Sequence, residues 1–253
     1  MKINFLILAG GDTPEWIINN EGVNHKCLIN INKKPAIIHI IDSINNSNTD
    51  HDIVLVGTQA LKEASIDKLV NKFIEVGIEN TLGDNVRFGF KETTGDYVVL
   101  LSGDIPGVTP DTFNKIDEMI NEASNYELIV PIITKSEIES KFPGSKRTYA
   151  KIKEGKVKIG NFLVIRKSSF AKLDPLINKY TEGRKSLIKL ILSFGIWNLI
   201  KLLLMGSLSI PELEKILLKT TGINAKGIIA PLGEVGVDLD KESDLQDLRN
   251  YIK

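Results

Sequence analysis

Short apolar runs that recur between segments of helical spacing constrain the fold of this chain most strongly. The runs are rich in Val, Ile and Leu and lack polar alternation, which is typical of strands covered on both faces. They lie at Ile3–Leu8, Asp52–Val56, Phe73–Val76, Tyr97–Leu101 and Leu128–Ile133. Repetition of strand and helix predicts an α/β fold with a doubly wound, mostly parallel sheet. Ligands of such sheets bind beyond the carboxyl ends of the strands.

The segments between and after these runs are predicted to be mainly helical. Helices are expected over 35–44, 61–73 and 85–91, from Pro110 toward Ala123, and at Glu242–Ile252. Two further strands are expected at Asn161–Ile165 and Ala225–Ile229, and the pattern from 168 to 220 is helical. The sequence therefore predicts one domain over residues 1–253 with a helical insertion at about 168–220.

Charge and cysteine content exclude several classes of protein. The 253 residues carry 32 Lys+Arg against 32 Asp+Glu, so the basic excess of a nucleic-acid binder is missing. The single cysteine, Cys27, excludes an internal disulfide and a Cys-rich zinc site. The apolar start runs into Gly10 and Gly11 rather than a cleavage-type segment, so we expect a buried strand and a cytoplasmic enzyme.

One long apolar stretch, from Leu187 to Met205, has two interpretations. Lys189, Gly195, Asn198 and Lys201 interrupt it, which argues against a membrane-spanning helix. A helix that is apolar nearly all round is usually buried in the protein or in a subunit interface, which would make the chain a homo-oligomer. Alternatively, residues 185–205 form a helix on a membrane surface, with lysines reaching the headgroups.

A pair of glycines follows the first predicted strand, in the segment Leu8-Ala9-Gly10-Gly11. Glycines there let a backbone approach phosphates closely, although two glycines after a strand also make an ordinary tight turn. Neither a dinucleotide-binding fingerprint nor a P-loop is present. Lys26 follows a little further along the chain. A lysine beside a glycine-rich backbone is suited to binding a triphosphate, although single lysines are usually surface residues.

A carboxylate follows the clearest strand, in Ser102-Gly103-Asp104-Ile105-Pro106. Mg²⁺ prefers oxygen ligands and usually takes one or two carboxylates together with waters and substrate phosphates. The Asp104 segment is also ordinary turn chemistry. Taken alone, this pattern leaves both interpretations open.

These motifs together resemble the sugar-phosphate and molybdenum-cofactor (MobA-like) nucleotidyltransferases, which have a glycosyltransferase-A-like fold. The resemblance rests on Leu-Ala-Gly-Gly, on Lys26, on Lys34-Pro35 before a helix and on the Gly-Asp-x-Pro of Asp104. It implies that the chain transfers a nucleoside monophosphate from an NTP to a phosphorylated small molecule with Mg²⁺. It also implies catalytic roles for Lys26 and Asp104, and nucleotide binding by Leu8, Ala9, Gly10, Gly11, Lys26, Asn85 and Gly103.

The resemblance also implies a second metal ligand near the C-terminus, in Gly236-Val237-Asp238. Asp238 matches the family position, and Asp240 is expected to cap the last helix instead, although the two roles are exchangeable. Asp238-Leu239-Asp240 is similar to the D-x-D of glycosyltransferases, but that motif lies mid-chain in those enzymes.

The acceptor side is expected to involve Arg147, Gly160 and Asn161. Arginine suits bidentate phosphate contact, and related enzymes place a Gly-Asn segment against the acceptor. A solvated basic loop and a turn asparagine are the alternative.

One departure from the family concerns the glycine loop, which lacks the usual Arg or Lys, because Asp12 follows Gly11. We therefore expect Lys26, Lys34 and the metal to neutralise the triphosphate. A glycosyltransferase and a non-catalytic nucleotide-binding protein are therefore kept as alternatives.

Overall fold

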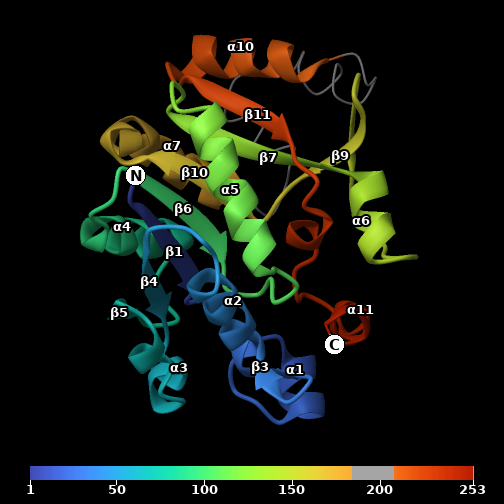
Figure 1. Ribbon diagram of the computed structural model, residues 1–253. Helices are drawn as coiled ribbons and strands as arrows, with labels where there is room; N and C mark the ends of the chain where they lie inside the picture. The colour runs from blue at the N-terminus through green and yellow to red at the C-terminus, as the bar shows by residue number, and fades with distance from the viewer. Residues whose placement is uncertain (184–207, 253) are drawn as a thin grey trace.

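The computed structural model describes residues 1–183 and 208–252, and within them nine strands form one twisted sheet (Figure 1). The strand order is β5-β4-β1-β6-β10-β7-β9-β8, with β11 paired to β7. The strands are β1 (Ile3–Ala9), β4 (His51–Gly57), β5 (Lys72–Glu75), β6 (Tyr97–Ser102), β7 (Leu128–Thr134), β8 (Ala150–Ile152), β9 (Gly155–Ile159), β10 (Phe162–Arg166) and β11 (Ala225–Ile229). A separate small hairpin joins β2 (Asn30–Ile31) to β3 (Lys34–Pro35).

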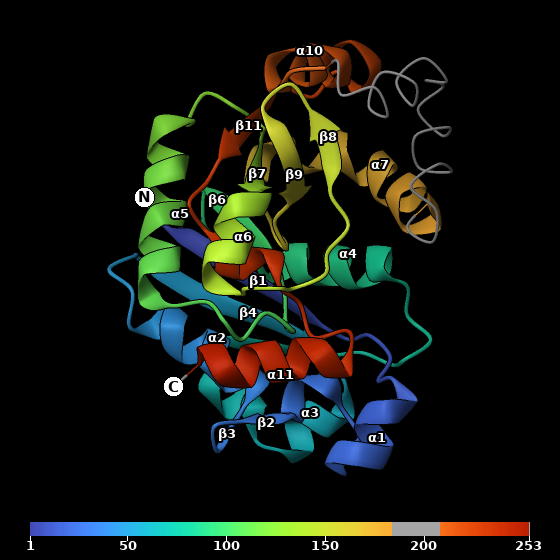
Figure 2. The same ribbon diagram turned by 90° about the vertical axis from the view of Figure 1, so that its right-hand side faces the viewer.

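Helices cover both faces of this sheet. They are α1 (Glu15–Glu21), α2 (Ala36–Asn45), α3 (Gln59–Glu63), α4 (Leu82–Glu92), α5 (Pro110–Glu122), α6 (Lys135–Lys141), α7 (Phe170–Gly183), α10 (Ile210–Thr221) and α11 (Glu242–Tyr251), with 3-10 turns η1 (Lys26–Leu28), η2 (Ile66–Leu69), η3 (Lys167–Ser169) and η4 (Gly233–Gly236). In Figure 2, α2 and α5 lie on one side of β1, β4 and β6, and α4 and α7 lie on the other. The sheet is thus doubly wound, as predicted.

The sheet is mixed but mostly parallel. Strand β1 pairs in parallel with β4 and β6, so that Leu8 lies beside Val56 and Ser102. Strands β9 and β10 run against the others, because β10 is antiparallel to both β6 and β7, and β9 is antiparallel to β7. The carboxyl ends of β1, β4 and β6 therefore share one edge, where parallel sheets bind ligands.

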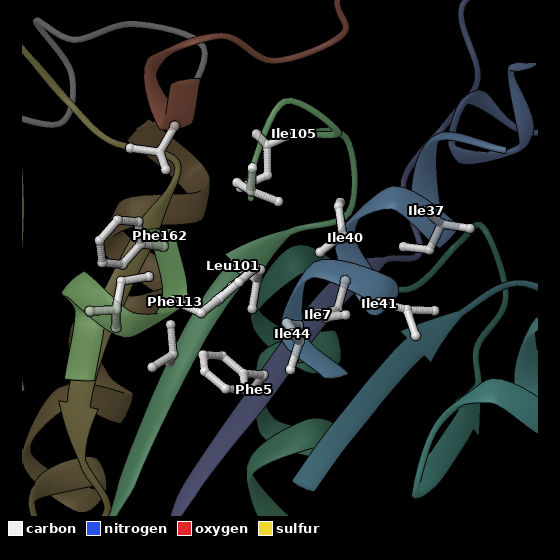
Figure 3. Packing of buried hydrophobic residues seen from close by; sticks show 14 of the residues in the cluster. Phe5, Ile7, Ile37, Ile40, Ile41, Ile44, Leu101, Ile105, Phe113 and Phe162 are labelled. Carbon is white, nitrogen blue, oxygen red and sulfur yellow. The ribbon is translucent and has the colours of Figure 1, made fainter. Parts of the chain in front are cut away.

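Two apolar layers hold the sheet, one on each face. Along β1, Phe5 and Ile7 pack with α2 and α5, whereas Leu6 packs with the α4 side. Figure 3 shows Phe5 and Ile7 among Phe113 of α5 and Ile40 of α2. Complete burial of such a side chain contributes about 1.5–3 kcal/mol. Burial of both faces explains why the strand sequences lack polar alternation.

The predicted helix over 61–73 is wrong. The chain forms α3, then η2, and then β5. Ser65 interrupts the helix because its φ of 60° lies in the left-handed region, which side chains other than glycine seldom adopt. The remaining apolar residues are therefore redirected into a 3-10 turn and an edge strand.

In the span of the helical insertion predicted at about 168–220, the structure describes α7 and α10. The apolar stretch within it, including residues 185–205, falls outside the described residues, so both of its interpretations stay predictions. No helix in the described ranges is long and apolar enough to cross a membrane.

Candidate active site

The glycine loop and the Asp104 loop follow neighbouring strands and press against each other. The Gly103 N–H donates to the Leu8 carbonyl across 2.9 Å. A Cβ at Gly103 would lie 2.9 Å from the Ala9 Cβ, closer than such atoms approach. Glycine at position 103 is therefore needed for close contact between the carboxyl ends of β1 and β6.

Gly10 packs against Asn85 in the first turn of α4. A Cβ at Gly10 would lie 2.7 Å from the Asn85 Nδ2, and Asn85 is only 4% exposed. The Asn85 Oδ1 is buried and accepts no hydrogen bond from any residue that the structure describes. A buried acceptor beside the glycine loop suits a ligand that donates to it.

His25 fixes the end of β1 from the other side. Its Nδ1 accepts from the Cys27 N–H at 3.2 Å, so the ring proton lies on Nε2 and donates to the Ala9 carbonyl at 2.9 Å. The ring is 3% exposed, and burial lowers the pKa of His25. No sequence pattern indicates this positioning role, because it depends on a contact between His25 and Ala9, which are sixteen residues apart in the chain.

Lys26 meets Asp104 in a buried ion pair, which brings the two predicted catalytic residues together. The Ser102 hydroxyl donates to the other Asp104 oxygen at 2.5 Å, and the Asp104 side chain is 5% exposed. Burial alone would lower the pKa of Lys26, but the charge and hydrogen bond of Asp104, together with smaller effects of Cys27 and Asp240, outweigh burial and raise the pKa. Lys26 is therefore a fixed cation beside the glycine loop.

The C-terminal carboxylates reach the same place. The Leu239 N–H donates to the Asp104 carbonyl at 3.0 Å, which sets Asp238 and Asp240 on either side of that contact. Lys26 lies 3.9 Å from the Asp240 carboxylate. Burial, and then repulsion from Asp238 and Asp104, raise the pKa of Asp240. Carboxylates that repel one another in this way attract a cation.

Asp238 is paired with two cations. Its Oδ1 lies 3.2 Å from the Lys158 Nζ and 3.7 Å from an Arg147 nitrogen. Burial would raise the pKa of Asp238, but Lys158 and Arg147 together lower it. Lys158 is a residue that sequence analysis missed. The sequence signal that points to it is its position near the end of β9, two residues before Gly160.

Of the predicted acceptor residues, Arg147 belongs to this cluster, and Gly160 and Asn161 contact Val235 in the turn before Asp238. Arg147 is 8% exposed and lies 2.8 Å from the Asp244 carboxylate as well as near Asp238. The Asn161 carbonyl accepts from the Ser102 N–H at 3.2 Å, and a Cβ at Gly160 would lie 2.9 Å from the Val235 side chain. The alternative of a solvated basic loop is therefore wrong for Arg147, which is buried and ion-paired.

One expectation about a neighbouring residue is wrong. Asp240 does not cap α11, because the N-cap of that helix is Lys241, whose N–H donates to the Asp244 carboxylate at 2.9 Å. Lys34 pairs with Asp42 of α2 at 2.6 Å in a half-exposed ion pair, so its part in neutralising a triphosphate stays a prediction. Lys26, in contrast, contacts Asp104.

The carboxylates fit a divalent cation as a partial ligand set. Their oxygens are the ligands that Mg²⁺ prefers, and Lys26 already stands between Asp104 and Asp240 as a cation. Within the described ranges, no three His, Cys, Asp or Glu side chains are arranged to hold a metal. A metal here would therefore take one or two carboxylates and complete its coordination with phosphate oxygens and water.

Comparison with known proteins identifies the class. The model of the MobA-like NTP transferase domain matches residues 5–193, so the chain belongs to that family of nucleotidyltransferases. A Pyrococcus horikoshii protein described as a probable molybdenum cofactor guanylyltransferase is 26% identical over 172 residues, which cover 64% of this chain and 81% of that protein.

Solved structures agree with this assignment. A hypothetical transferase from Thermus thermophilus has a TM-score of 0.84 and 29% identity, and the match covers 97% of this chain and all of that one. The Mycobacterium tuberculosis protein Rv0371c, solved as a complex with manganese, shares the fold with a TM-score of 0.56 at 14% identity over the whole of both chains. A protein with this fold has thus been observed with a divalent metal.

Proposed function

We propose that this chain transfers a nucleoside monophosphate from an NTP to a phosphorylated small molecule (a sugar, polyol or cofactor phosphate) and releases pyrophosphate. The observation that carries the proposal is the placement of two cation sets around the clustered carboxylates. Lys26 stands with Asp104 beside the glycine loop, and Arg147 and Lys158 stand with Asp238. The NTP and the acceptor both carry negative phosphates, and each phosphate needs cations that hold it in position to react with the other.

The nucleotide half of the site is proposed at the carboxyl end of β1. Backbone N–H groups of Gly10 and Gly11 would contact the triphosphate, and Lys26 would neutralise the departing pyrophosphate. Asn85 would accept a hydrogen bond from the nucleoside. Leu8, Ala9 and Gly103 shape this loop by backbone contact.

The acceptor half is proposed beside β9 and β10. Arg147 would hold the acceptor phosphate, and Gly160 and Asn161 would line the acceptor's path. Asp104 and Asp238 would hold Mg²⁺, which when bound neutralises charge on the α-phosphate and orients the two phosphates. A general base is not needed, because a phosphate oxygen is already ionised at neutral pH.

Pyrophosphate release tests this proposal. Each of ATP, GTP, CTP and UTP is incubated with Mg²⁺ and a panel of sugar, polyol and cofactor phosphates, and pyrophosphate is measured. We expect release with one NTP and one acceptor class, lowered by about 10²–10³-fold in Asp104→Asn, because a ligand of the metal that would neutralise the transferring phosphate is lost. Asp111→Asn on the exposed surface of α5 is the control and keeps wild-type release.

Two outcomes would contradict the proposal. Binding of an NTP without pyrophosphate release from any acceptor would favour the non-catalytic alternative. Binding of a nucleotide sugar, with no binding of any NTP, would favour glycosyl transfer on the same fold.

A further inference from the structure

Lys158 occupies an unusual position between the two halves of the proposed site. Its Nζ lies 3.2 Å from the Asp238 carboxylate and donates to the Gly236 carbonyl at 2.8 Å. Asp238 is one of the two proposed metal ligands. In this structure the ammonium of Lys158 already contacts its Oδ1. A divalent metal at Asp238 would stand beside the ammonium of Lys158, and two like charges at such a distance repel.

The two cations around Asp238 differ in freedom. Arg147 is 8% exposed, and it is anchored by Asp244, which is itself 5% exposed. Lys158 is 22% exposed and ends in a compact ammonium on a flexible stem. Arg147 is therefore a fixed phosphate-binding group, whereas Lys158 is able to turn from Asp238 to an anion that arrives beside Arg147.

We propose that Lys158 is a positioning residue that exchanges partners when the acceptor phosphate binds. Without acceptor, Lys158 holds Asp238 and keeps the metal site incomplete. With the acceptor phosphate in place, Lys158 moves from Asp238 to a phosphate oxygen, and Asp238 becomes free to bind the metal. The inference rests on the proposed function, because it needs an acceptor phosphate next to Arg147.

This exchange couples two ligands of opposite charge. Phosphate that takes Lys158 away from Asp238 must strengthen metal binding, and the metal must strengthen phosphate binding by the same factor. The metal would then gain Asp238 as its second carboxylate only when the acceptor is present, which would limit hydrolysis of the NTP by water. A purely structural ion pair between Lys158 and Asp238 predicts that any coupling between phosphate and metal is the same with and without Lys158.

Titration with Mn²⁺ tests the exchange without any catalysis. Free Mn²⁺ is measured by electron paramagnetic resonance with and without millimolar inorganic phosphate, and a protein-free blank corrects for Mn²⁺–phosphate complexes. For the wild type we expect phosphate to lower the Mn²⁺ dissociation constant by about tenfold, within the usual range of coupling. Lys158→Gln should bind Mn²⁺ more tightly than the wild type without phosphate, and phosphate should then change its affinity less than twofold.

Lys156→Gln is the matched control, because it removes the same charge from the exposed part of the same strand and should behave as the wild type. Lys158→Met keeps the stem and replaces Lys158→Gln if that variant does not fold. Equal coupling in the wild type and the Lys158 variants, or no coupling in the wild type, would overturn the exchange. Pyrophosphate release that persists beside such a result would leave the proposed function standing, so the two failures are distinguishable.

Discussion

At the scale of single residues, hydrogen bonds and close packing of a few residues set the conformation of the glycine loop. The neutral ring of His25 bridges the Cys27 N–H and the Ala9 carbonyl, and Gly10 leaves room for Asn85. Neither contact is visible in the sequence, because each joins residues that are distant along the chain. Both act on the same few backbone groups that would face a triphosphate.

The buried His25 ring makes stability depend on pH. Its folded pKa is lowered by burial, whereas the unfolded chain binds a proton near the ordinary value of about 6.5. Below that pH the unfolded state holds more protons than the folded state, so stability is lost as the pH falls. Urea unfolding at pH 7, 6 and 5 should show a smaller loss for His25→Gln than for the wild type. Equal losses would contradict this account of His25.

The two glycines of the loop should respond differently to alanine. In Gly10→Ala the new Cβ would meet the Asn85 side chain at 2.7 Å and the Val76 side chain at 2.8 Å, and such overpacking costs about 1–3 kcal/mol. In Gly11→Ala the new Cβ meets nothing within 4 Å, so the change should stay within about 0.5 kcal/mol. Urea unfolding of both variants measures the difference, and equal costs would show that Gly10 is not closely packed.

At the scale of elements, the turn η4 ties two helices to the segment that carries Asp238. Glu234 of this turn is 2% exposed, forms an ion pair with Lys141 of α6 and accepts from the Thr112 hydroxyl of α5 at 2.6 Å. A buried carboxylate with two partners from different helices fixes where the following residues lie. Gly233 allows this packing, because a Cβ there would meet the Glu137 carbonyl at 2.2 Å.

Removing one partner of the Glu234–Lys141 pair should be costly. In Glu234→Ala, the buried Thr112 hydroxyl and the partly exposed Lys141 ammonium lose their shared acceptor, and a buried donor left unsatisfied costs about 1–3 kcal/mol. Chemical unfolding should show this loss, whereas the control Glu139→Gln on the exposed face of α6 should change stability by less than about 0.5 kcal/mol. A small effect of Glu234→Ala would mean that Lys141 finds water or another acceptor.

The sequence predicts elements better than it predicts their contacts. Strands such as Tyr97–Leu101 are evident because burial on both faces requires a continuous apolar run. The helix over 61–73 fails because one residue, Ser65, adopts a positive φ that its type does not signal. The expected capping role of Asp240 fails because several polar residues stand near the start of α11, and the local pattern does not show that the helix begins after Lys241.

Part of the candidate site can be predicted where a motif marks the end of a strand, as Asp104 does after β6. Lys26, Asp104 and Arg147 lie in contact with proposed site residues, as the motifs lead one to expect. Lys158 and His25 were missed because their roles depend on partners in Asp238 and Ala9, which lie far from them in sequence. Their roles could be found once the strands were placed side by side.

At the scale of the whole molecule, the last segment of the chain closes onto the first. Arg249 of α11 pairs with Glu21 of α1 at 2.6 Å, and the Trp16 indole N–H donates to the Asp240 carbonyl at 3.3 Å. Figure 2 shows α11 lying near α1 and the β2–β3 hairpin. The proposed metal ligands, Asp104 and Asp238, are thus brought together by contacts between the two ends of the chain, and their geometry depends on the complete fold.

Thermal unfolding with each of the four NTPs, with and without Mg²⁺, tests directly whether Asp104 is part of a nucleotide and metal site. A ligand at a hundred times its dissociation constant stabilises by about 2.7 kcal/mol. We expect a Mg²⁺-dependent shift with one NTP in the wild type and in Asp111→Asn, and its loss in Asp104→Asn. An equal Mg²⁺-dependent shift in Asp104→Asn, or no shift with any NTP, would contradict a nucleotide and metal site built on Asp104.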